Sequence, residues 1–154
     1  MEIERKYKVK NLDFITESFQ VIEIKQGFLN SDANRTVRIR VNEDQGFITV
    51  KGKSSEDGLS RFEWEKAIPK EEAIDLLALC ERGIIDKKRY LVNFQNQIFE
   101  IDVFYGENEG LIIAEIELPS IDSIPQLPDW IDEEVTGNTK YYNSQLAKFP
   151  FKSW

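Results

Sequence analysis

The first eight residues, Met1 to Lys8, place charged side chains at every second position. In an extended strand Glu2, Glu4, Lys6 and Lys8 would project from a single face. Carboxylates two residues apart supply the hard oxygen ligands that Mg²⁺ and Mn²⁺ prefer, and ammonium groups can bind the phosphate oxygens that a metal leaves uncovered. The segment is therefore suited to a metal and a phosphate, although alternating charge is also typical of a solvated strand.

The composition restricts the chemistry that the chain can perform. The 154 residues include no histidine and a single cysteine, Cys80. This excludes Ser-His-Asp and Cys-His catalysis, histidine-bound zinc and an intramolecular disulfide. Cys80 continues the apolar positions Ala73, Leu76 and Leu77 at helical spacing, so we interpret it as a core residue. The remaining candidates are carboxylates, lysines, arginines, hydroxyls and bound metal.

The charge and the length bound the class of protein. The net charge is −8, from 28 acidic and 20 basic side chains. This charge would repel nucleic acid unless the cations gathered on one surface, so we predict no nucleic-acid partner. No run of 18 apolar residues and no secretory signal is present, which predicts a cytoplasmic protein without a membrane segment. The length predicts one domain over residues 1–154.

Eight segments of alternating or apolar residues, bounded by turn residues, predict strands. They are 2–8, 21–29, 35–42, 46–53, 60–68, 86–94, 97–105 and 110–118. Short turn sequences between neighbours predict antiparallel hairpins, and a meander of eight strands can close into a barrel. Helices are predicted at 69–82, opened by Pro69 and ended by Gly83, and at 11–19, with a further C-terminal helical segment from about residue 131.

Most of the predicted strands have one charged face and one apolar face. Arg38 and Arg40, for example, alternate with Val37, Ile39 and Val41. The charged positions of the other strands that follow this pattern include Lys51, Lys53, Arg61, Glu63, Glu65, Lys87, Arg89, Glu100, Asp102, Glu115 and Glu117. Strands built this way must place one whole row of charges on one side of the sheet.

This pattern has two structural interpretations, and segment 21–29 follows it only loosely, with Glu23 and Lys25 opposite Ile22 and Ile24. In an open sheet the charged face meets water, and each exposed ion pair contributes at most about 1 kcal/mol. In a closed sheet the charges line a lumen, where two charges about 4 Å apart interact by about 4 kcal/mol at an effective dielectric near 20. A lumen of that kind requires a charged ligand, and a polyphosphate with a divalent metal would balance it.

Short motifs occur along the chain in a fixed order. They are Glu2-x-Glu4-x-Lys6, Gln26-Gly27-Phe28-Leu29, Arg38-x-Arg40, Thr49-x-Lys51, Gly58-Leu59-x-Arg61-x-Glu63-x-Glu65, Lys87-x-Arg89-Tyr90, Asp102-Val103-Phe104, Glu115-x-Glu117, and Glu134-Val135-Thr136 followed by Lys140-Tyr141. This series resembles the CYTH domains, also termed triphosphate tunnel metalloenzymes, almost end to end. The resemblance implies a mainly β (α+β) fold, an eight-stranded antiparallel closed barrel with a few helices packed outside, whose tunnel binds a triphosphate.

The resemblance also implies roles for individual residues. It implies metal ligands, direct or through water, at Glu2, Glu4, Glu115 and Glu117, with additional carboxylates at Glu63, Glu65 and Asp102. It implies phosphate-binding residues at Lys6, Arg38, Arg40, Lys51, Lys87 and Arg89, with Lys140 closing one tunnel mouth. Lys6, Lys51 and Glu4 would take part in catalysis with two Mg²⁺ or Mn²⁺ ions, as a metal-bound water attacks a terminal phosphorus in line.

The activity implied is a metal-dependent inorganic triphosphatase with a small anionic substrate, acting as a monomer or a homodimer. A class IV adenylyl cyclase or an organic triphosphatase is an alternative within the family, and a non-catalytic polyphosphate or nucleotide sensor is an alternative of another class. Some hydrolytic relatives have a tyrosine, proposed to activate water together with a lysine, where this sequence has Phe28. Lys51 or a carboxylate-held water would take that task here, or hydrolysis is slower, or the substrate differs; Tyr7 and Tyr90 are further candidates.

Overall fold

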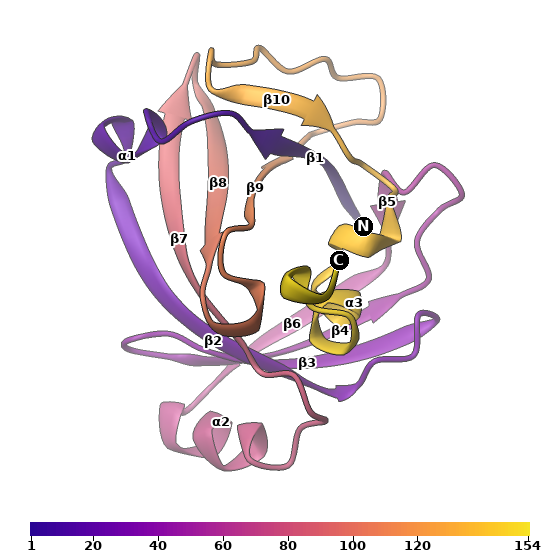
Figure 1. Cartoon of the computed structure of the whole chain (residues 1–154). Helices are drawn as coiled ribbons and strands as arrows, with labels where there is room; N and C mark the ends of the chain where they lie inside the picture. The colour runs from indigo at the N-terminus through magenta and orange to yellow at the C-terminus, as the bar shows by residue number, and fades with distance from the viewer.

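The structure, a computed structural model that describes residues 1–154, is built around one ten-stranded sheet (Figure 1). Its strands are β1 (Glu2–Val9), β2 (Gln20–Asn30), β3 (Arg35–Val41), β4 (Gly46–Gly52), β5 (Ser60–Arg61), β6 (Glu63–Ile68), β7 (Ile85–Phe94), β8 (Gln97–Phe104), β9 (Ile112–Glu117) and β10 (Ile131–Glu134). Every strand pair is antiparallel, which confirms the predicted mainly β architecture.

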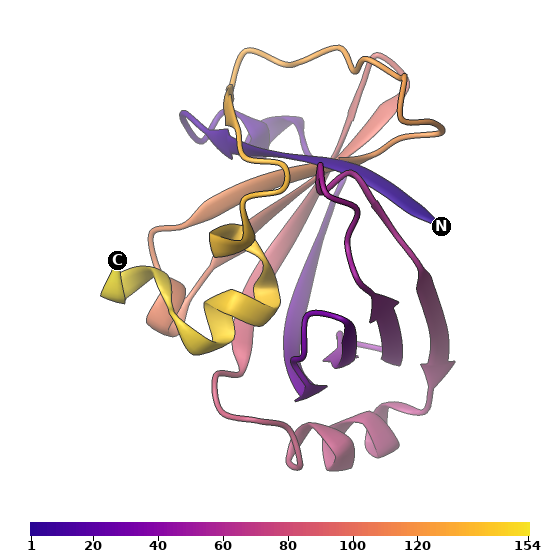
Figure 2. The same cartoon turned by 90° about the vertical axis from the view of Figure 1, so that its right-hand side faces the viewer.

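The sheet curls round on itself, but its hydrogen-bonded ladder does not close. The main path runs β10-β1-β9-β8-β7-β2-β3-β4-β6, and the two residues of β5 pair with Glu2 and Ile3 of β1. The chain then passes from β5 to β6 across Phe62, so a short ladder and a covalent step join the ends of the curl (Figure 2). The predicted segment 60–68 is thus divided in two, and a complete eight-stranded closed barrel is not confirmed.

Two turns follow the chemistry of their residues. Between β3 and β4, the side-chain oxygen of Asn42 accepts hydrogen bonds from the backbone N–H groups of Asp44 and Gln45. Between β7 and β8, Gln95 and Asn96 have positive φ angles of 53° and 63°. A pair of left-handed residues is what a two-residue hairpin requires, so both predicted hairpins form.

The helices are shorter than the sequence pattern predicts. They are α1 (Phe14–Glu17), α2 (Lys70–Leu77) and α3 (Asn143–Lys148), with single 3₁₀ turns η1 (Gly106–Asn108), η2 (Thr139–Tyr141) and η3 (Phe151–Ser153). Helix α2 begins after Pro69 as predicted, but it ends at Leu77, and turns carry the chain on toward Gly83. None of these helices has the length and apolarity that crossing a membrane demands.

The C-terminal segment begins as a strand, so the prediction of a helical segment from about residue 131 is wrong at its start. Residues 131–134 form β10, which pairs with β1 at Tyr7 and Val9. Trp130 and Ile131 are buried in the same apolar cluster as Tyr7, and this packing with the paired backbone favours a strand. The helix begins only at Asn143.

Helix α3 does not pack outside the sheet, in contrast to the prediction for the helices. Its residues Asn143 and Ser144 line a cavity within the curl, and Leu146 is buried with Ile85 and Phe104. Figure 1 shows the C-terminal segment in yellow within the ring that the strands outline. The helix therefore obstructs one end of the interior.

The larger of the two apolar clusters lies on the outer face of the sheet. Ten buried side chains cover β1, β7, β8 and β9 on that side, namely Tyr7, Phe14, Val92, Phe99, Ile101, Ala114, Ile116, Leu118, Trp130 and Ile131. On the opposite part of the curl, α2 covers β2, β3 and β4, and its buried Ala73 lies so close to Gly46 that a Cβ on that glycine would collide with it. Because the apolar rows face outward beneath these covers, the alternating charged rows face inward.

Strand β2 reverses the pattern of its neighbours. Ile22 and Ile24 lie directly opposite Arg89 and Lys87 of β7, so all four share the inner face. Glu23 is exposed on the outer face. The loose match of segment 21–29 to the charged pattern therefore reflects an inverted strand, with apolar side chains inside.

Candidate active site

Charged side chains from six strands surround one cavity inside the curl, which we term the central chamber. Its lining residues are Glu4, Lys6, Phe28, Thr36, Arg38, Lys51, Arg61, Lys87, Arg89, Glu115, Tyr142, Asn143 and Ser144. The structure thus brings Glu4, Arg38, Lys51, Arg89 and Glu115 together, although they are far apart in the sequence. An inward-facing charged row explains this arrangement, and an exposed row does not.

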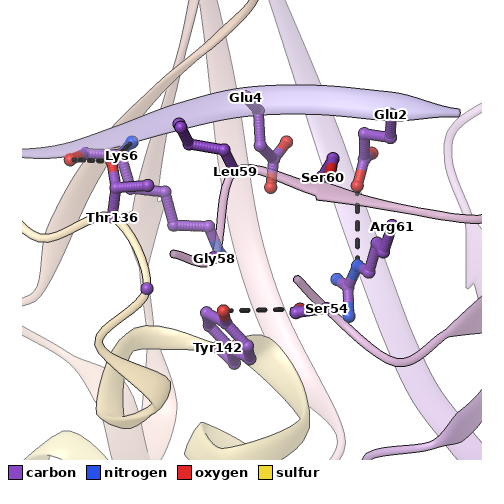
Figure 3. A pocket seen from close by; sticks show the side chains of 11 residues that line it. Glu2, Glu4, Lys6, Ser54, Gly58, Leu59, Ser60, Arg61, Thr136 and Tyr142 are labelled. Carbon is purple, nitrogen blue, oxygen red and sulfur yellow. Dashed lines mark hydrogen bonds and ion pairs between the residues drawn. The ribbon is translucent and has the colours of Figure 1, made fainter. Parts of the chain in front are cut away.

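A second cavity, which we term the side chamber, adjoins the first (Figure 3). Its lining residues are Glu2, Glu4, Lys6, Ser54, Gly58, Leu59, Ser60, Arg61, Thr136, Gly137 and Tyr142. Figure 3 shows Glu2, Glu4 and Lys6 extending from β1 toward Arg61 and Tyr142. Because Glu4, Lys6, Arg61 and Tyr142 line both chambers, they form the wall between them.

On the β7–β8 wall, both carboxylate oxygens of Asp102 accept hydrogen bonds from cationic side chains. Arg89 donates to it through Nε (2.8 Å to Oδ1) and Nη2 (2.9 Å to Oδ2), and Lys87 Nζ lies 2.8 Å from Oδ2. Burial alone would raise the pKa of Asp102, but Arg89 and Lys87 hold it well below its ordinary value. Burial lowers the pKa of Lys87 to about 8 despite Asp102. Asp102 thus orients two cations, and no oxygen of it is free of them.

Glu4 has the opposite environment on the β1–β9 wall. Burial, and next the nearby charge of Glu115, raise its pKa to about 8. Glu115 itself is paired with Lys6, whose Nζ lies 3.6 Å from Oε1. Burial would raise the pKa of Glu115, but Lys6 lowers it overall. Glu4 is therefore the carboxylate that most needs an additional cation in order to ionise.

Lys51 joins Glu2 and Glu63 across the gap between β4 and β1. Its Nζ lies 3.1 Å from Glu2 Oε1 and 3.6 Å from Glu63 Oε2, and Arg61 Nε lies 3.6 Å from the same Glu2 oxygen. Burial would raise the pKa of Glu2, but a hydrogen bond with Glu63 and the charge of Lys51 lower it to about 2. The same hydrogen bond, followed by burial, raises the pKa of Glu63 to about 7. Of these two carboxyls, Glu63 is therefore the one that keeps its proton more readily.

Arg38 has an unsatisfied donor inside the curl. Its Nη2 is 3.3 Å from Thr49 Oγ1 and 3.7 Å from Glu65 Oε1, but its buried Nε has no hydrogen-bond partner. Arg40 shares Glu65 with it at 3.3 Å. Burial, and next the charge of Arg40, lower the pKa of Arg38 to about 10. A buried guanidinium with an unpaired N–H is suited to an anion in the chamber.

Six of the predicted site residues line neither chamber. Arg40, Glu63, Glu65 and Asp102 belong to ion pairs that reach the lining residues, whereas Lys140 and Glu117 lie farther away. Lys140 is exposed, and its ammonium lies 4.0 Å from the ring centroid of Trp154. Glu117 is exposed as well, in an open groove that it shares with Glu100. Tyr7 and Tyr90, which the sequence left as candidates for activating water, belong to the outer apolar cluster.

The C-terminal segment contributes site residues that the sequence pattern did not reveal. Tyr142 lines both chambers, and the Asn143 side-chain oxygen accepts hydrogen bonds from Gln26 Nε2 and Lys87 Nζ, both at 3.1 Å. Neither belongs to a strand, so the period-two analysis could not place them. Arg61 was recognisable as part of a charged row, although no role was assigned to it.

The carboxylates are compatible with a hydrated divalent ion. No three acidic side chains form a group that could hold an ion by themselves. Mg²⁺ commonly uses one or two carboxylates and completes its shell with water and substrate phosphate. The pair Glu4 and Glu115 matches that requirement, since Glu4 is half-buried, has a raised pKa and forms no ion pair with a lysine or arginine. The free volume of the central chamber is about 40 Å³, room for only a few water molecules, so a polyphosphate must separate the ion-paired side chains to bind.

A curled antiparallel sheet whose interior opposes carboxylates to lysines and arginines is suited to binding an anion together with a cation. A family model described as the CYTH domain matches residues 1–150, and the chain belongs to this family. It is 45% identical over 154 residues to an inorganic triphosphatase of Acetivibrio thermocellus, covering 99% of this chain and 97% of the relative. It is 34% identical over 150 residues to an inorganic triphosphatase of Nitrosomonas europaea, covering 95% and 96% respectively.

A solved structure supports the same assignment. A crystal structure of an inorganic triphosphatase aligns with a TM-score of 0.67 and 31% identity, covering 96% of this chain and 94% of that chain. The family relationship predicted from the ordered motifs is therefore confirmed.

Proposed function

We propose that this chain is a metal-dependent triphosphatase that hydrolyses inorganic tripolyphosphate to phosphate and pyrophosphate. The observation that carries the proposal is the single chamber lined by Arg38, Lys51, Arg89, Glu4 and Glu115. Cations alone would suffice to bind an anion, whereas buried carboxylates among them are costly unless a metal is to be held. The two relatives named as inorganic triphosphatases support the choice of substrate.

The cations would bind the three phosphoryl groups and stabilise the charge that develops on them. Arg38 offers an unpaired buried Nε–H, and Arg89 is held in one orientation by Asp102. Lys6 and Lys51 are mobile point charges that can leave Glu115 and Glu2 for a phosphate oxygen. In phosphoryl transfer, positioning and charge stabilisation account for most of the catalysis.

Two carboxylate pairs would hold the metal. Glu4 with Glu115 faces the central chamber, and Glu2 with Glu63 lies beside Lys51. When bound, Mg²⁺ or Mn²⁺ supplies charge neutralisation and a water of lowered pKa. Each pair contains one carboxyl whose pKa is raised, to about 8 in Glu4 and about 7 in Glu63, and releasing that proton prepares the pair for a cation.

The side chain at position 28 limits which residues can act on water. Phe28 lines the central chamber and is 5% exposed, and its ring offers no hydroxyl. We propose that Lys51 holds the attacked phosphate while water is oriented by Glu4. We also propose that β5 and β6 act together as one wall, so that the curl encloses the bound substrate despite the break at Phe62.

Phosphate release from four substrates tests this function. Tripolyphosphate, pyrophosphate, ATP and thiamine triphosphate are each incubated with Mg²⁺ or Mn²⁺ and with the metal chelated. We expect the highest kcat/KM for tripolyphosphate, activity that requires the metal, and equal molar yields of phosphate and pyrophosphate. Glu4→Gln serves as the inactive variant, and Glu133→Gln, on the exposed strand β10, serves as its matched control.

The other outcomes are equally informative. Formation of cyclic AMP from ATP would identify a cyclase, and a preference for ATP or thiamine triphosphate would identify an organic triphosphatase. Tight binding of tripolyphosphate without turnover would identify a sensor. Any of these three results contradicts the proposed substrate or reaction.

A further inference from the structure

Tyr142 occupies the wall between the two chambers. It lines both cavities and precedes α3 as its N-cap residue. Its backbone is anchored, because its N–H donates to Thr139 O at 3.0 Å and its carbonyl accepts from Gln145 and Leu146, both at 2.9 Å. A side chain that leaves so fixed a backbone has a defined place in the site.

The ring of Tyr142 faces two of the site's cations. Lys6 Nζ lies 4.8 Å from the ring centroid and Arg61 Cζ lies 5.6 Å from it. Both distances fall within the range of about 6 Å over which an aromatic face attracts a cation. The ring therefore helps to hold two like charges side by side at the chamber junction, where the Lys6 side chain extends toward Tyr142 (Figure 3).

The hydroxyl of Tyr142 has only one weak hydrogen-bond contact within the protein. Its one hydrogen-bond contact, to Ser54 Oγ, is 3.5 Å long. Hydroxyl hydrogen bonds are typically about 2.7 to 2.8 Å long, so this contact leaves the donor largely unused. An unused donor beside Lys6 is available to an anion that enters either chamber.

Tyr142 is also the single phenol of the site. Of the chain's five tyrosines, Tyr7 and Tyr90 pack on the outer face, Tyr105 lies beside Lys88, and Tyr141 packs on Trp154. Phe28 lines the same central chamber without a hydroxyl. If the reaction uses a phenol, position 142 is where the fold supplies it.

We propose that Tyr142 is a substrate-binding residue whose hydroxyl donates a hydrogen bond to a phosphate oxygen at the chamber junction, while its ring keeps Lys6 turned toward the same phosphate. This inference deepens the proposed function and rests on it. The hydroxyl contributes to binding in the ground state and in the transition state alike, so its loss raises KM more than it lowers kcat. The ring acts through Lys6, so its loss lowers kcat as well.

Steady-state kinetics with tripolyphosphate and Mg²⁺ test the hydroxyl through Tyr142→Phe. We expect KM to rise about 10-fold, the effect of losing one hydrogen bond to a charged acceptor, while kcat stays within about twofold. Tyr141→Phe is the matched control, because it removes a hydroxyl one residue away that lies outside both chambers. The control should retain the KM of the unaltered chain. An unchanged KM in Tyr142→Phe, or an equal rise in the control, overturns the proposal.

Tyr142→Leu separates the ring from the hydroxyl. We expect it to share the KM defect of Tyr142→Phe and to lose kcat in addition, by about 10-fold, because Lys6 is no longer held by an aromatic face. A thermal melt of each variant checks its fold, and if Tyr142→Leu unfolds it is replaced by Tyr142→Met, which also lacks the ring. If kcat is the same in Tyr142→Leu and Tyr142→Phe, the role assigned to the ring is wrong.

Calorimetric titration of tripolyphosphate distinguishes this inference from the function on which it rests. If the unaltered chain binds tripolyphosphate without hydrolysing it, the proposed reaction fails, and a weaker affinity of Tyr142→Phe still supports the binding role. If the affinity of Tyr142→Phe equals that of the unaltered chain, or if the unaltered chain binds no tripolyphosphate, the binding role fails as well.

Discussion

The two walls of the central chamber treat their acids in opposite ways. On the β7–β8 wall, Asp102 accepts three hydrogen bonds of 2.8 to 2.9 Å from Lys87 and Arg89. On the β1–β9 wall, Glu4 has no cation of its own and its pKa is raised to about 8. Asp102 is buried and Glu4 is half-buried, and both lie on the inner face of a strand. Their difference lies in the residues that the antiparallel register places opposite them.

The register explains the contrast. Asp102 lies directly opposite Arg89. Glu4 has no base opposite it, because its partner is Glu117, and Glu115, whose charge raises its pKa after burial, lies opposite the neighbouring Lys6. An acid opposite a base forms a stable ion pair, whereas an acid with other acids beside it needs an additional cation in order to ionise. The β7–β8 wall therefore fixes the positions of phosphate-binding side chains, and the β1–β9 wall reserves a place for the metal.

Removing the acid of Glu4 gives the largest expected effect on activity. We expect Glu4→Gln to lower kcat/KM for tripolyphosphate by more than about 100-fold, beyond the range typical of residues that only support a metal ligand. Because glutamine resembles the protonated acid that the buried site favours, the melting temperature should not fall. Activity is measured over a Mg²⁺ titration, with Glu133→Gln as control. Full activity of Glu4→Gln at high Mg²⁺ would show that this wall does not hold the metal.

Asp102→Asn should have the opposite effect to Glu4→Gln. We expect its main effect to be a loss of stability rather than a loss of metal-dependent activity. The substitution leaves the buried Lys87 without a counter-charge and Arg89 with only Glu100, whose Oε2 lies 3.1 Å from Nη1. Removing one partner of a buried pair costs about 3 to 5 kcal/mol of the free energy of unfolding. Urea unfolding of the metal-free chain measures the loss, and Glu4→Gln in the same experiment provides the comparison. If both variants unfold at the same urea concentration, the two walls do not differ as described.

Only part of this contrast between the two walls could be predicted from the sequence. The charged rows, the antiparallel pairing and the inward direction of residues such as Arg38 and Arg89 follow from period-two alternation, which is a local property. The opposition of Asp102 to Arg89 and of Glu4 to Glu117 depends on the register between strands. Register is set by turns and bulges, for example the irregularity between Phe28 and Asn30, and alternation does not encode it.

The C-terminal segment shows a second limit of the sequence. Residues 131–134 form β10 and Tyr142 enters the site, yet no periodicity marks either feature. Both depend on packing between distant segments: the strand pairs with β1, and Tyr142 lines chambers built by strands from β1 to β9. The division of segment 60–68 at Phe62 is of the same kind, because it arises where β5 turns to pair with β1 and β6 pairs with β4.

Arg38→Lys tests whether the third side of the chamber binds substrate by geometry or by charge alone. Lysine keeps the positive charge but loses the Nε–H that has no partner in the protein. We expect kcat/KM for tripolyphosphate to fall about 10-fold, in keeping with one charge-assisted hydrogen bond. Arg35→Lys on the exposed start of β3 is the matched control and should be unaffected. A lysine variant as active as the control would indicate that only the charge matters.

The smallest expected effect is on how stability depends on pH without metal. Because the pKa of Glu4 is about 8 in the folded chain against an ordinary value of 4.5, the folded state holds a proton that the unfolded state has released between these values. The free energy of unfolding should therefore fall as pH rises from 6 to 8, by up to about 1.4 kcal/mol per pH unit from this one group. Glu63, with a pKa of about 7, acts in the same direction. Asp102 is ionised throughout this window and adds no slope.

Urea unfolding in the presence of a chelator should thus give a flatter pH profile for Glu4→Gln than for the unaltered chain, and Mg²⁺ should stabilise the unaltered chain increasingly as pH rises. Parallel profiles for the two chains would mean that Glu4 is no harder to ionise than an ordinary acid, and the distinction between the walls would then rest on Asp102 alone.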